Sequence, residues 1–310
     1  MRYRPFGRSG VVLSAITLAI GDDLARRGQD KCAALILQAL EHGINSFHLE
    51  TAEPDAAIAL GEALSVLERR LLFVSLRLGL GKGRTGVVRD FSPEALMHAV
   101  EQTLRLSNLG HLDLVILDDP GEEELPIRSM TALKSLRSAG RVNLLGVAGT
   151  DDAMDAYLST GAFDVLATPY GVTSGWKERN RMRAAVDQDM GIVAYDWFPE
   201  HLTSQAKIEK AELPPQKRGL FGAVGKAFQD PDPFEGIGGY SFLHRTSNWT
   251  AEEICLGFTL TEPAVSSAWV ETADPDRLDR LAAVPDRDLP PGLGAQIEMA
   301  RFSAAREQSA

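Results

Sequence analysis

Short, nearly continuous apolar runs recur along the chain and alternate with longer segments of helical periodicity. The run at 112–117, Leu-Asp-Leu-Val-Ile-Leu, is typical of them. A strand with so few polar positions needs cover on both faces, as strands in parallel sheets have. The pattern predicts eight such strands: Leu13–Ile20, Ser46–Glu50, Leu72–Leu78, Leu112–Leu117, Val142–Ala148, Val165–Pro169, Ile192–Asp196 and Val265–Val270.

Segments of helix length lie between these runs. Lys31–Glu41 places Ile36 and Leu40 on one helical face. Ser92 begins another helix with Pro93 in its first turn, where a missing N–H and a fixed φ are tolerated. The remaining helices are expected at 124–138, 151–160, 177–189, 250–260 and 275–283.

Strand and helix alternate eight times, which selects either a closed barrel or a doubly wound sheet. Eight repeats over 310 residues favour the barrel, and the first strand is not followed by the Gly-x-Gly-x-x-Gly of dinucleotide folds. The glycine-rich run Gly79–Arg84 lacks that spacing and is expected to form a flexible loop. We therefore predict an α/β fold, a single (β/α)8 TIM barrel domain spanning residues 1–310. A long irregular loop is expected at 200–248, between strands seven and eight, and any ligand site at the carboxyl-end mouth.

Composition narrows the class of protein. The net charge of −11 argues against nucleic acid and anionic membranes as partners, because both attract basic surfaces. The two cysteines, Cys32 and Cys255, lie in segments expected to be helical and indicate a reducing compartment without disulfides. No secretory signal and no run of roughly 20 apolar residues occurs, so a cytoplasmic protein is expected.

Short motifs that follow one another in a characteristic order carry a family resemblance: Tyr3–Gly10, Gly43–Asn45, Glu50–Ala52, Leu60–Leu64, Leu112–Leu114, Gly140–Val147 and Gly191–Tyr195. In these motifs the chain resembles the aldo-keto reductase family over nearly its whole length. The resemblance implies an N-terminal hairpin that closes the bottom of the barrel. It also implies carbonyl reduction with NADPH by an Asp, a Tyr, a Lys and a His at the mouth, with the Tyr as proton donor.

The four catalytic positions of that family hold different residues in this chain. The resemblance places Glu50 at the Asp position, Asp55 at the Tyr, Arg77 at the Lys and Asp118 at the His. An ungapped alignment places His48 at the Asp position instead. Arg77 cannot release its proton, and Asp118 adds negative charge where an alkoxide would form. These substitutions therefore oppose hydride reduction.

The positions that hold the cofactor in the family also differ. Ala148–Gly149 stands where the family has Ser-Asn, and Ala167, beside Thr168, stands where it has Gln. The acidic stretch Glu271–Asp276 occupies the place that normally receives the 2′-phosphate, and carboxylates repel a phosphate dianion. Tyr195 alone keeps its place beneath the nicotinamide. NADPH, the family cofactor, is therefore not expected to bind.

Three hypotheses of function follow. The first is a pseudoenzyme that keeps the barrel as a binding module for a small-molecule ligand at the mouth or for a protein partner. The second is a cofactor-independent acid–base enzyme that uses the four substituted positions, Glu50, Asp55, Arg77 and Asp118. The third is an NAD(P)H-dependent oxidoreductase whose proton donor lies elsewhere, such as Tyr170 or the long loop.

Further residues are expected to contact a ligand at the mouth: His48, Asp119, Thr168, Tyr195 and Trp197. Structural roles compete with these assignments, since an Asp before a Pro is common in turns and a buried His often only completes a core. The spacing of acidic and His residues matches no metal motif, so no metal is expected. Their shared position at strand ends favours a functional site, because catalytic residues of such barrels lie there.

Overall fold

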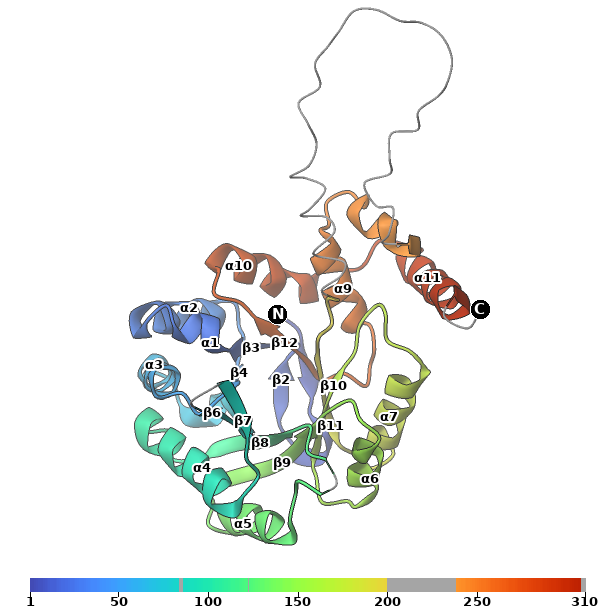
Figure 1. Ribbon diagram of the computed structural model, residues 1–310. Helices are drawn as coiled ribbons and strands as arrows, with labels where there is room; N and C mark the ends of the chain where they lie inside the picture. The colour runs from blue at the N-terminus through green and yellow to red at the C-terminus, as the bar shows by residue number, and fades with distance from the viewer. Residues whose placement is uncertain (84–85, 122, 200–237, 308–310) are drawn as a thin grey trace, which may run out of the picture.

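A closed barrel of eight parallel strands forms the centre of the structure (Figure 1). The computed structural model describes residues 1–83, 86–121, 123–199 and 238–307. Around the barrel the strands are β3 (Ile16–Ile20), β4 (Ser46–Leu49), β5 (Phe73–Leu78), β8 (Leu112–Asp118), β9 (Val142–Ala148), β10 (Val165–Pro169), β11 (Gly191–Tyr195) and β12 (Ser267–Glu271). Each predicted strand is present, with bounds shifted by at most a few residues, and the predicted barrel is confirmed.

An antiparallel hairpin of β1 (Tyr3–Pro5) and β2 (Val12–Ser14) precedes the barrel. The first predicted strand therefore divides into β2 and β3. Phe6 is 1% exposed and packs edge-on against Phe73, with ring centroids 5.4 Å apart. A Cβ on Gly191, the first residue of β11, would collide with the Phe6 ring. The hairpin therefore closes the amino end of the barrel, as the family resemblance implied.

One principal helix follows each strand and covers the outer face of the barrel (Figure 1). Ser92 caps its helix by accepting a hydrogen bond from Ala95 N, with Pro93 in the first turn as predicted. The principal helices are α2 (Gln29–Glu41), α3 (Pro54–Leu64), α4 (Pro93–Ser107), α5 (Ile127–Ser138), α6 (Ala153–Ser159), α7 (Trp176–Val186), α9 (Ala251–Thr259) and α10 (Pro275–Ala283). The short helix α1 (Asp22–Ala25) precedes α2, and α11 (Leu293–Glu307) follows the barrel. None of the helices in the described residues has both the length and the apolar character that a membrane span requires.

The glycine-rich run after β5 is a hairpin, so the predicted flexible loop at Gly79–Arg84 is wrong. Strand β6 (Leu80–Gly83) pairs antiparallel with β7 (Gly86–Arg89). Gly79 has φ +96°, and the ring of Phe91 lies where a Cβ would stand. The glycine therefore allows β5 to turn sharply into the hairpin beside the mouth. Of the predicted long loop, 200–237 lies outside the described residues, and Gly238–His244 forms a 3₁₀ helix.

Alternation along the strands divides their side chains between the barrel interior and the helix layer. Ala19, Ile116, Ala167 and Trp269 belong to the inner apolar cluster. Thr168 follows Ala167 directly and therefore points the opposite way, toward the helices. Its hydroxyl is fully buried and has no hydrogen-bond partner among the described residues. Thr168, predicted to contact a ligand at the mouth, therefore faces the helix layer.

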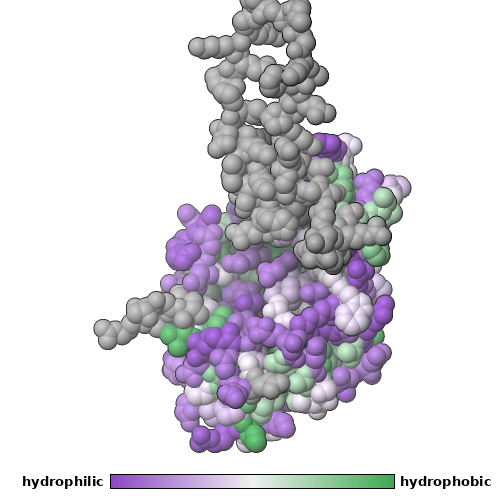
Figure 2. All heavy atoms as spheres, turned by 45° about the vertical axis from the view of Figure 1, so that its right-hand side comes forward, coloured by the Kyte–Doolittle hydropathy of each residue, from purple (hydrophilic) through white to green (hydrophobic). Residues whose placement is uncertain are grey.

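Hydrophobic residues that remain on the surface are scattered among hydrophilic ones on the face shown in Figure 2. Trp176 at the start of α7 is 77% exposed. Trp197 is 4% exposed. Its indole Nε1 donates a hydrogen bond of 2.6 Å to the carbonyl oxygen of Trp269, which ties the segment after β11 to β12.

Candidate functional site

Three neighbouring strand ends bring charged side chains together at the carboxyl end of the barrel. Glu50 directly follows β4, Arg77 lies near the end of β5, and Asp118 ends β8. Nη1 of Arg77 is 3.0 Å from Oε2 of Glu50 and 3.3 Å from Oδ1 of Asp118. We call Glu50, Arg77, Asp118 and the neighbouring His48 the mouth cluster. Three of the four substituted catalytic positions therefore meet in space.

His48 lies one layer deeper in the barrel and is fully buried. Its Nδ1 is 2.8 Å from the hydroxyl of Ser75, which in turn donates to the carbonyl oxygen of Phe47. A Ser75 hydroxyl that donates to a carbonyl accepts from Nδ1–H, and this leaves Nε2 as the unprotonated acceptor. Nε2 is 3.7 Å from Oε1 of Glu50 and has no hydrogen-bond partner among the described residues.

An indole that sequence reasoning did not single out fills the space beside these groups. Trp269 stacks on His48, with ring centroids 3.9 Å apart, and on Tyr195 at 5.6 Å. The guanidinium carbon of Arg77 is 5.2 Å from the centre of its ring. Trp269 lies two residues before Glu271 on β12, so the two side chains point to the same inner side of the barrel, and this spacing was the available signal. One face of Tyr195 is therefore covered by the protein itself.

The mouth is acidic, and burial shifts the pKa of several of its groups. Burial raises the pKa of Glu50 to about 7, against the lowering effect of Arg77 and with further raising by Glu271, Asp118 and Asp196. Burial also raises the pKa of both Asp196 and Glu271, while Arg77 lowers each. Four carboxylates thus share one guanidinium, and Glu50 changes protonation near neutral pH.

His48 is the neutral member of the cluster. Burial, followed by the positive charge of Arg77, holds the pKa of His48 well below its usual range. Burial likewise raises the pKa of Tyr195 well above its usual range. Neither side chain is therefore charged near neutral pH, and Glu50 is the group of the mouth that exchanges a proton there.

Two predicted residues lie apart from the mouth cluster. Asp55 is exposed in the first turn of α3, where its Oδ1 accepts a hydrogen bond of 3.0 Å from Gln29. It therefore does not supply a buried proton donor in place of the family's Tyr. Asp119 has φ +45° and accepts a hydrogen bond from the backbone N–H of Thr150. That contact supports its role as a turn cap between β8 and the loop after β9.

A cleft of about 530 Å³ opens beside the mouth cluster and shares Arg77 with it. One wall is the β6–β7 hairpin, with Leu80 and Val88, and the opposite wall is α4, with Leu96 and Ala99. Its size suits a small ligand, and polar and apolar surfaces contribute about equally to its walls. The cleft gives such a ligand a route to the charged centre of the mouth.

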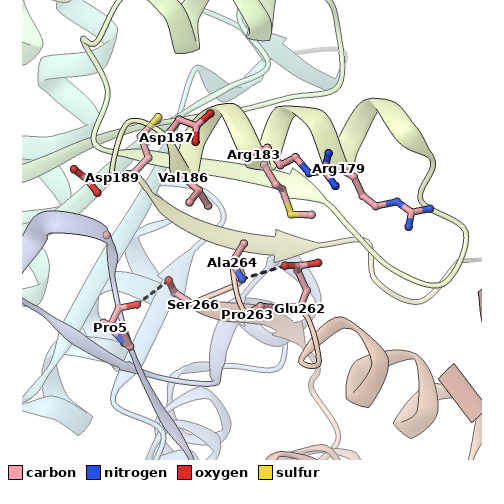
Figure 3. Close-up of a pocket in the computed structure, with 13 residues that line it drawn as sticks. Pro5, Arg179, Arg183, Val186, Asp187, Asp189, Glu262, Pro263, Ala264 and Ser266 are labelled. Carbon is pink, nitrogen blue, oxygen red and sulfur yellow. Dashed lines mark hydrogen bonds between the residues drawn. The ribbon is translucent and has the colours of Figure 1, made fainter.

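A larger cleft of about 610 Å³ lies at the opposite, amino end of the barrel (Figure 3). Arg179 and Arg183 of α7 line it, and Figure 3 shows Glu262 on the other side, accepting a hydrogen bond from Ala264 N. Its lining contains no buried side chain with an unpartnered polar atom among the described residues. The mouth, where ligands of such barrels bind, is therefore the stronger candidate.

At the expected phosphate position, the described residues offer no free cation. Arg277, which lies in α10 after the end of β12, donates from Nε and Nη2 to Oε1 of Glu252 at 2.8 and 2.5 Å. Its Nη1 donates to the carbonyl oxygen of Glu271. After β9, a Cβ on Gly149 would collide with the carboxylate of Asp119. Within the described residues, no group of three or more His, Cys, Asp or Glu side chains has the geometry of a metal site.

Comparisons with known proteins place this barrel in a family. It is similar to the holo form of the aldo-keto reductase AKR11C1 from Bacillus halodurans, with 16% identity over 97% of this chain and 96% of that chain and a TM-score of 0.72. It is also similar to PA4992 from Pseudomonas aeruginosa, described as an aldo-keto reductase, with 19% identity over 91% and 94% of the two chains and a TM-score of 0.64. A search of curated proteins found no match. The sequence profile of the Aldo/keto reductase family matches residues 17–298, and the chain belongs to this family.

Proposed function

We propose that this barrel catalyses proton transfer at Glu50 without a nicotinamide cofactor. The observation that carries the proposal is the position of the Glu50 carboxyl, 3.0 Å from Nη1 of Arg77 and 3.7 Å from Nε2 of His48. The pKa of Glu50, about 7, supports it, because a general acid or base is most effective when its pKa lies near the working pH.

The arrangement suits reactions that move a proton next to a carbonyl group. Ionised Glu50 removes a proton from the carbon beside the carbonyl, and the bonding pair moves to the carbonyl oxygen to give an enolate. Arg77 carries a buried Nε–H without a partner among the described residues, and this donor can meet the enolate oxygen. Protonated Glu50 then returns its proton to the same carbon, which exchanges that hydrogen with solvent. In an α-hydroxycarbonyl it can instead protonate the former carbonyl carbon, while the adjacent hydroxyl passes its proton to the enolate oxygen and becomes the new carbonyl, which completes an isomerisation.

His48 and Asp118 position this pair. The unprotonated Nε2 of His48 faces the Glu50 carboxyl at 3.7 Å, and Ser75 maintains that tautomer. Asp118 holds the guanidinium through the same Nη1 that contacts Glu50. A neutral imidazole cannot compete for the proton of Glu50, so the carboxyl alone titrates.

The residues at the family's NADPH positions do not fit that cofactor. Trp269 stacks on Tyr195, the ring that would lie against a nicotinamide. Arg277 is already neutralised by Glu252. Tyr170, the alternative proton donor, is 4% exposed, and its hydroxyl faces Glu262 at 3.5 Å, a residue that lines the amino-end cleft. These contacts support a function in which hydride transfer plays no part.

Deuterium exchange tests the proposal directly. The protein is incubated in D2O with a panel of small hydroxyketones and hydroxyaldehydes, and deuterium incorporation is followed by mass spectrometry. We expect exchange with at least one compound, and a loss of about 100-fold or more in Glu50→Gln. Asp55→Asn is the matched control, because Asp55 is exposed and bonded to Gln29; it should leave exchange unchanged.

Titration of NADPH and NADH, followed by cofactor fluorescence, tests the part of the proposal that excludes a nicotinamide cofactor. We expect no micromolar binding of either cofactor. Micromolar binding of either cofactor would contradict the proposal and favour an NAD(P)H-dependent reductase. Absence of exchange with the whole panel, or exchange that survives Glu50→Gln, would leave the mouth as a binding module without this chemistry.

A further inference from the structure

We infer that the ligand of the mouth carries a positively charged amine. This inference rests on the proposed function, since it names the substrate class of the same site. Glu50 and Asp118 pair with Arg77, and Asp196 and Glu271 act electrostatically on the same end of the barrel, where the cations are Arg77 and, beside Glu271, Arg277. When all four are ionised, they leave an excess of negative charge that an ammonium group would offset.

A second, independent observation comes from the interior of the barrel. Nε2 of His48 is a fully buried acceptor, faces Glu50 and has no hydrogen-bond partner among the described residues. A buried acceptor without a partner is costly, and a ligand that brings a donor relieves that cost. An ammonium group brings three N–H donors and no acceptor, which matches a site composed of carboxylate oxygens and an imidazole lone pair.

The route into the site has the same character. The cleft that reaches Arg77 is lined by Glu53 and Asp90 as well as by the apolar side chains of Leu80, Val88 and Leu96. A ligand with a short apolar body and a cationic head therefore meets complementary surfaces along its path.

The opposite end of the barrel has different charges and provides an internal comparison. Arg179 and Arg183 line the amino-end cleft together with Asp187 and Asp189 (Figure 3). Counted with Glu262, three carboxylates face two arginines there, so that cleft has a smaller excess of negative charge than the mouth, where four carboxylates face Arg77 and Arg277. Selectivity for a cation is therefore expected to be stronger at the mouth.

Three ligands of nearly the same shape test the inference: benzylamine, benzyl alcohol and benzoate. Binding is measured by isothermal titration calorimetry at low ionic strength, and the site is located from the chemical shifts of the indole N–H groups. We expect benzylamine to bind at least 10-fold more tightly than benzyl alcohol, and benzoate to bind most weakly. Added salt should weaken benzylamine binding selectively, because the attraction is electrostatic.

Paired substitutions locate the charges responsible. Asp196→Asn with Glu271→Gln should reduce benzylamine affinity about 10-fold and leave benzyl alcohol unchanged. Asp187→Asn with Asp189→Asn removes two carboxylate charges at the amino-end cleft. This pair should change neither the affinity for benzylamine nor the affinity for benzyl alcohol. Equal or tighter binding of benzoate, equal effects of the two pairs, or no binding of benzylamine would overturn the inference. Deuterium exchange and its loss in Glu50→Gln report on the proposed function independently of these affinities.

Discussion

The imidazole of His48 lies flat against the indole of Trp269, with ring centroids 3.9 Å apart and ring planes 11° from parallel. The two residues stand on β4 and β12, which are separated by β3. Ala19 of β3 pairs in register with His48 on one side and with Glu271 on the other. Because alanine is small, the two rings meet above the intervening strand and close the centre of the barrel.

Removal of the imidazole should therefore destabilise the fold. His48→Ala leaves a cavity beside Trp269 and should lower the free energy of unfolding by about 2–4 kcal/mol. Chemical denaturation followed by tryptophan fluorescence measures the change. The control is His98→Ala, which removes an exposed histidine of α4 and should stay within about 0.5 kcal/mol of wild type. Equal stability of the two variants would show that the stacked pair contributes nothing.

Glu50 should make stability depend on pH in an identifiable direction. Its pKa is about 7 in the folded protein against 4.5 as its ordinary value, so the folded state holds the proton more tightly. Stability contributed by this group is therefore complete below pH 4.5 and is lost as pH rises through 7. Glu50→Gln mimics the protonated carboxyl. As pH rises from 4.5 to 8, the free energy of unfolding of this variant should increase relative to that of wild type by up to about 3 kcal/mol.

Denaturation of both proteins at pH 4.5, 6 and 8 provides the measurement for Glu50→Gln. Asp55→Asn, a conservative change at an exposed carboxyl, is the control and should track wild type at all three values. A constant difference between Glu50→Gln and wild type across this range would contradict the raised pKa.

The Arg77 side chain should contribute more to the stability of the fold at high pH than at low pH. Its charge opposes the raised pKa of Glu50, Asp196 and Glu271, so its removal leaves these carboxylates without a cation once they ionise. We expect Arg77→Gln to be destabilised by several kcal/mol at pH 8 and by clearly less at pH 5. The thermal unfolding midpoint at each pH reports the difference, and an equal shift at both values would refute it.

Arg181 should hold the loop that follows β9. It is 3% exposed, and its guanidinium donates to the carbonyl oxygens of Gly149, Thr150 and Asp151 as well as to Asp155. Arg181→Met should leave these carbonyls unsatisfied and cost about 1–3 kcal/mol, with faster hydrogen exchange in the loop. Arg183→Met, a change at an exposed position of the same helix, should alter neither quantity. If hydrogen exchange in the loop after β9 is unchanged in Arg181→Met, Arg181 does not hold this loop.

Strand order and barrel closure were predictable because the relevant signal is local. A run such as Leu112–Leu117 can be satisfied only with cover on both faces, and its repetition selects the architecture. The glycine run at 79–84 was misassigned because glycine serves both loops and sharp turns, and only the Phe91 ring and the β7 partner strand decide between them.

The candidate site was predictable in part. Glu50, Arg77 and Asp118 end neighbouring strands, so their meeting follows from the fold once the strands are identified. Thr168 faces the helix layer because one residue of register reverses the direction of a strand side chain, and the sequence alone does not set that register. Trp269 was not singled out, since an aromatic residue in an apolar strand carries no local sign of the pair that it forms with His48.

The sequence by itself determined the barrel, the family and the identity of the residues at the strand ends, because periodicity and motif order are properties of the chain. Only the tertiary structure decided that Glu50 is shielded between Arg77 and a neutral His48 while Asp55 remains in solvent. Burial and the distance between charges set a pKa, and both depend on segments far apart in the chain. The chemistry of the mouth is therefore a consequence of packing.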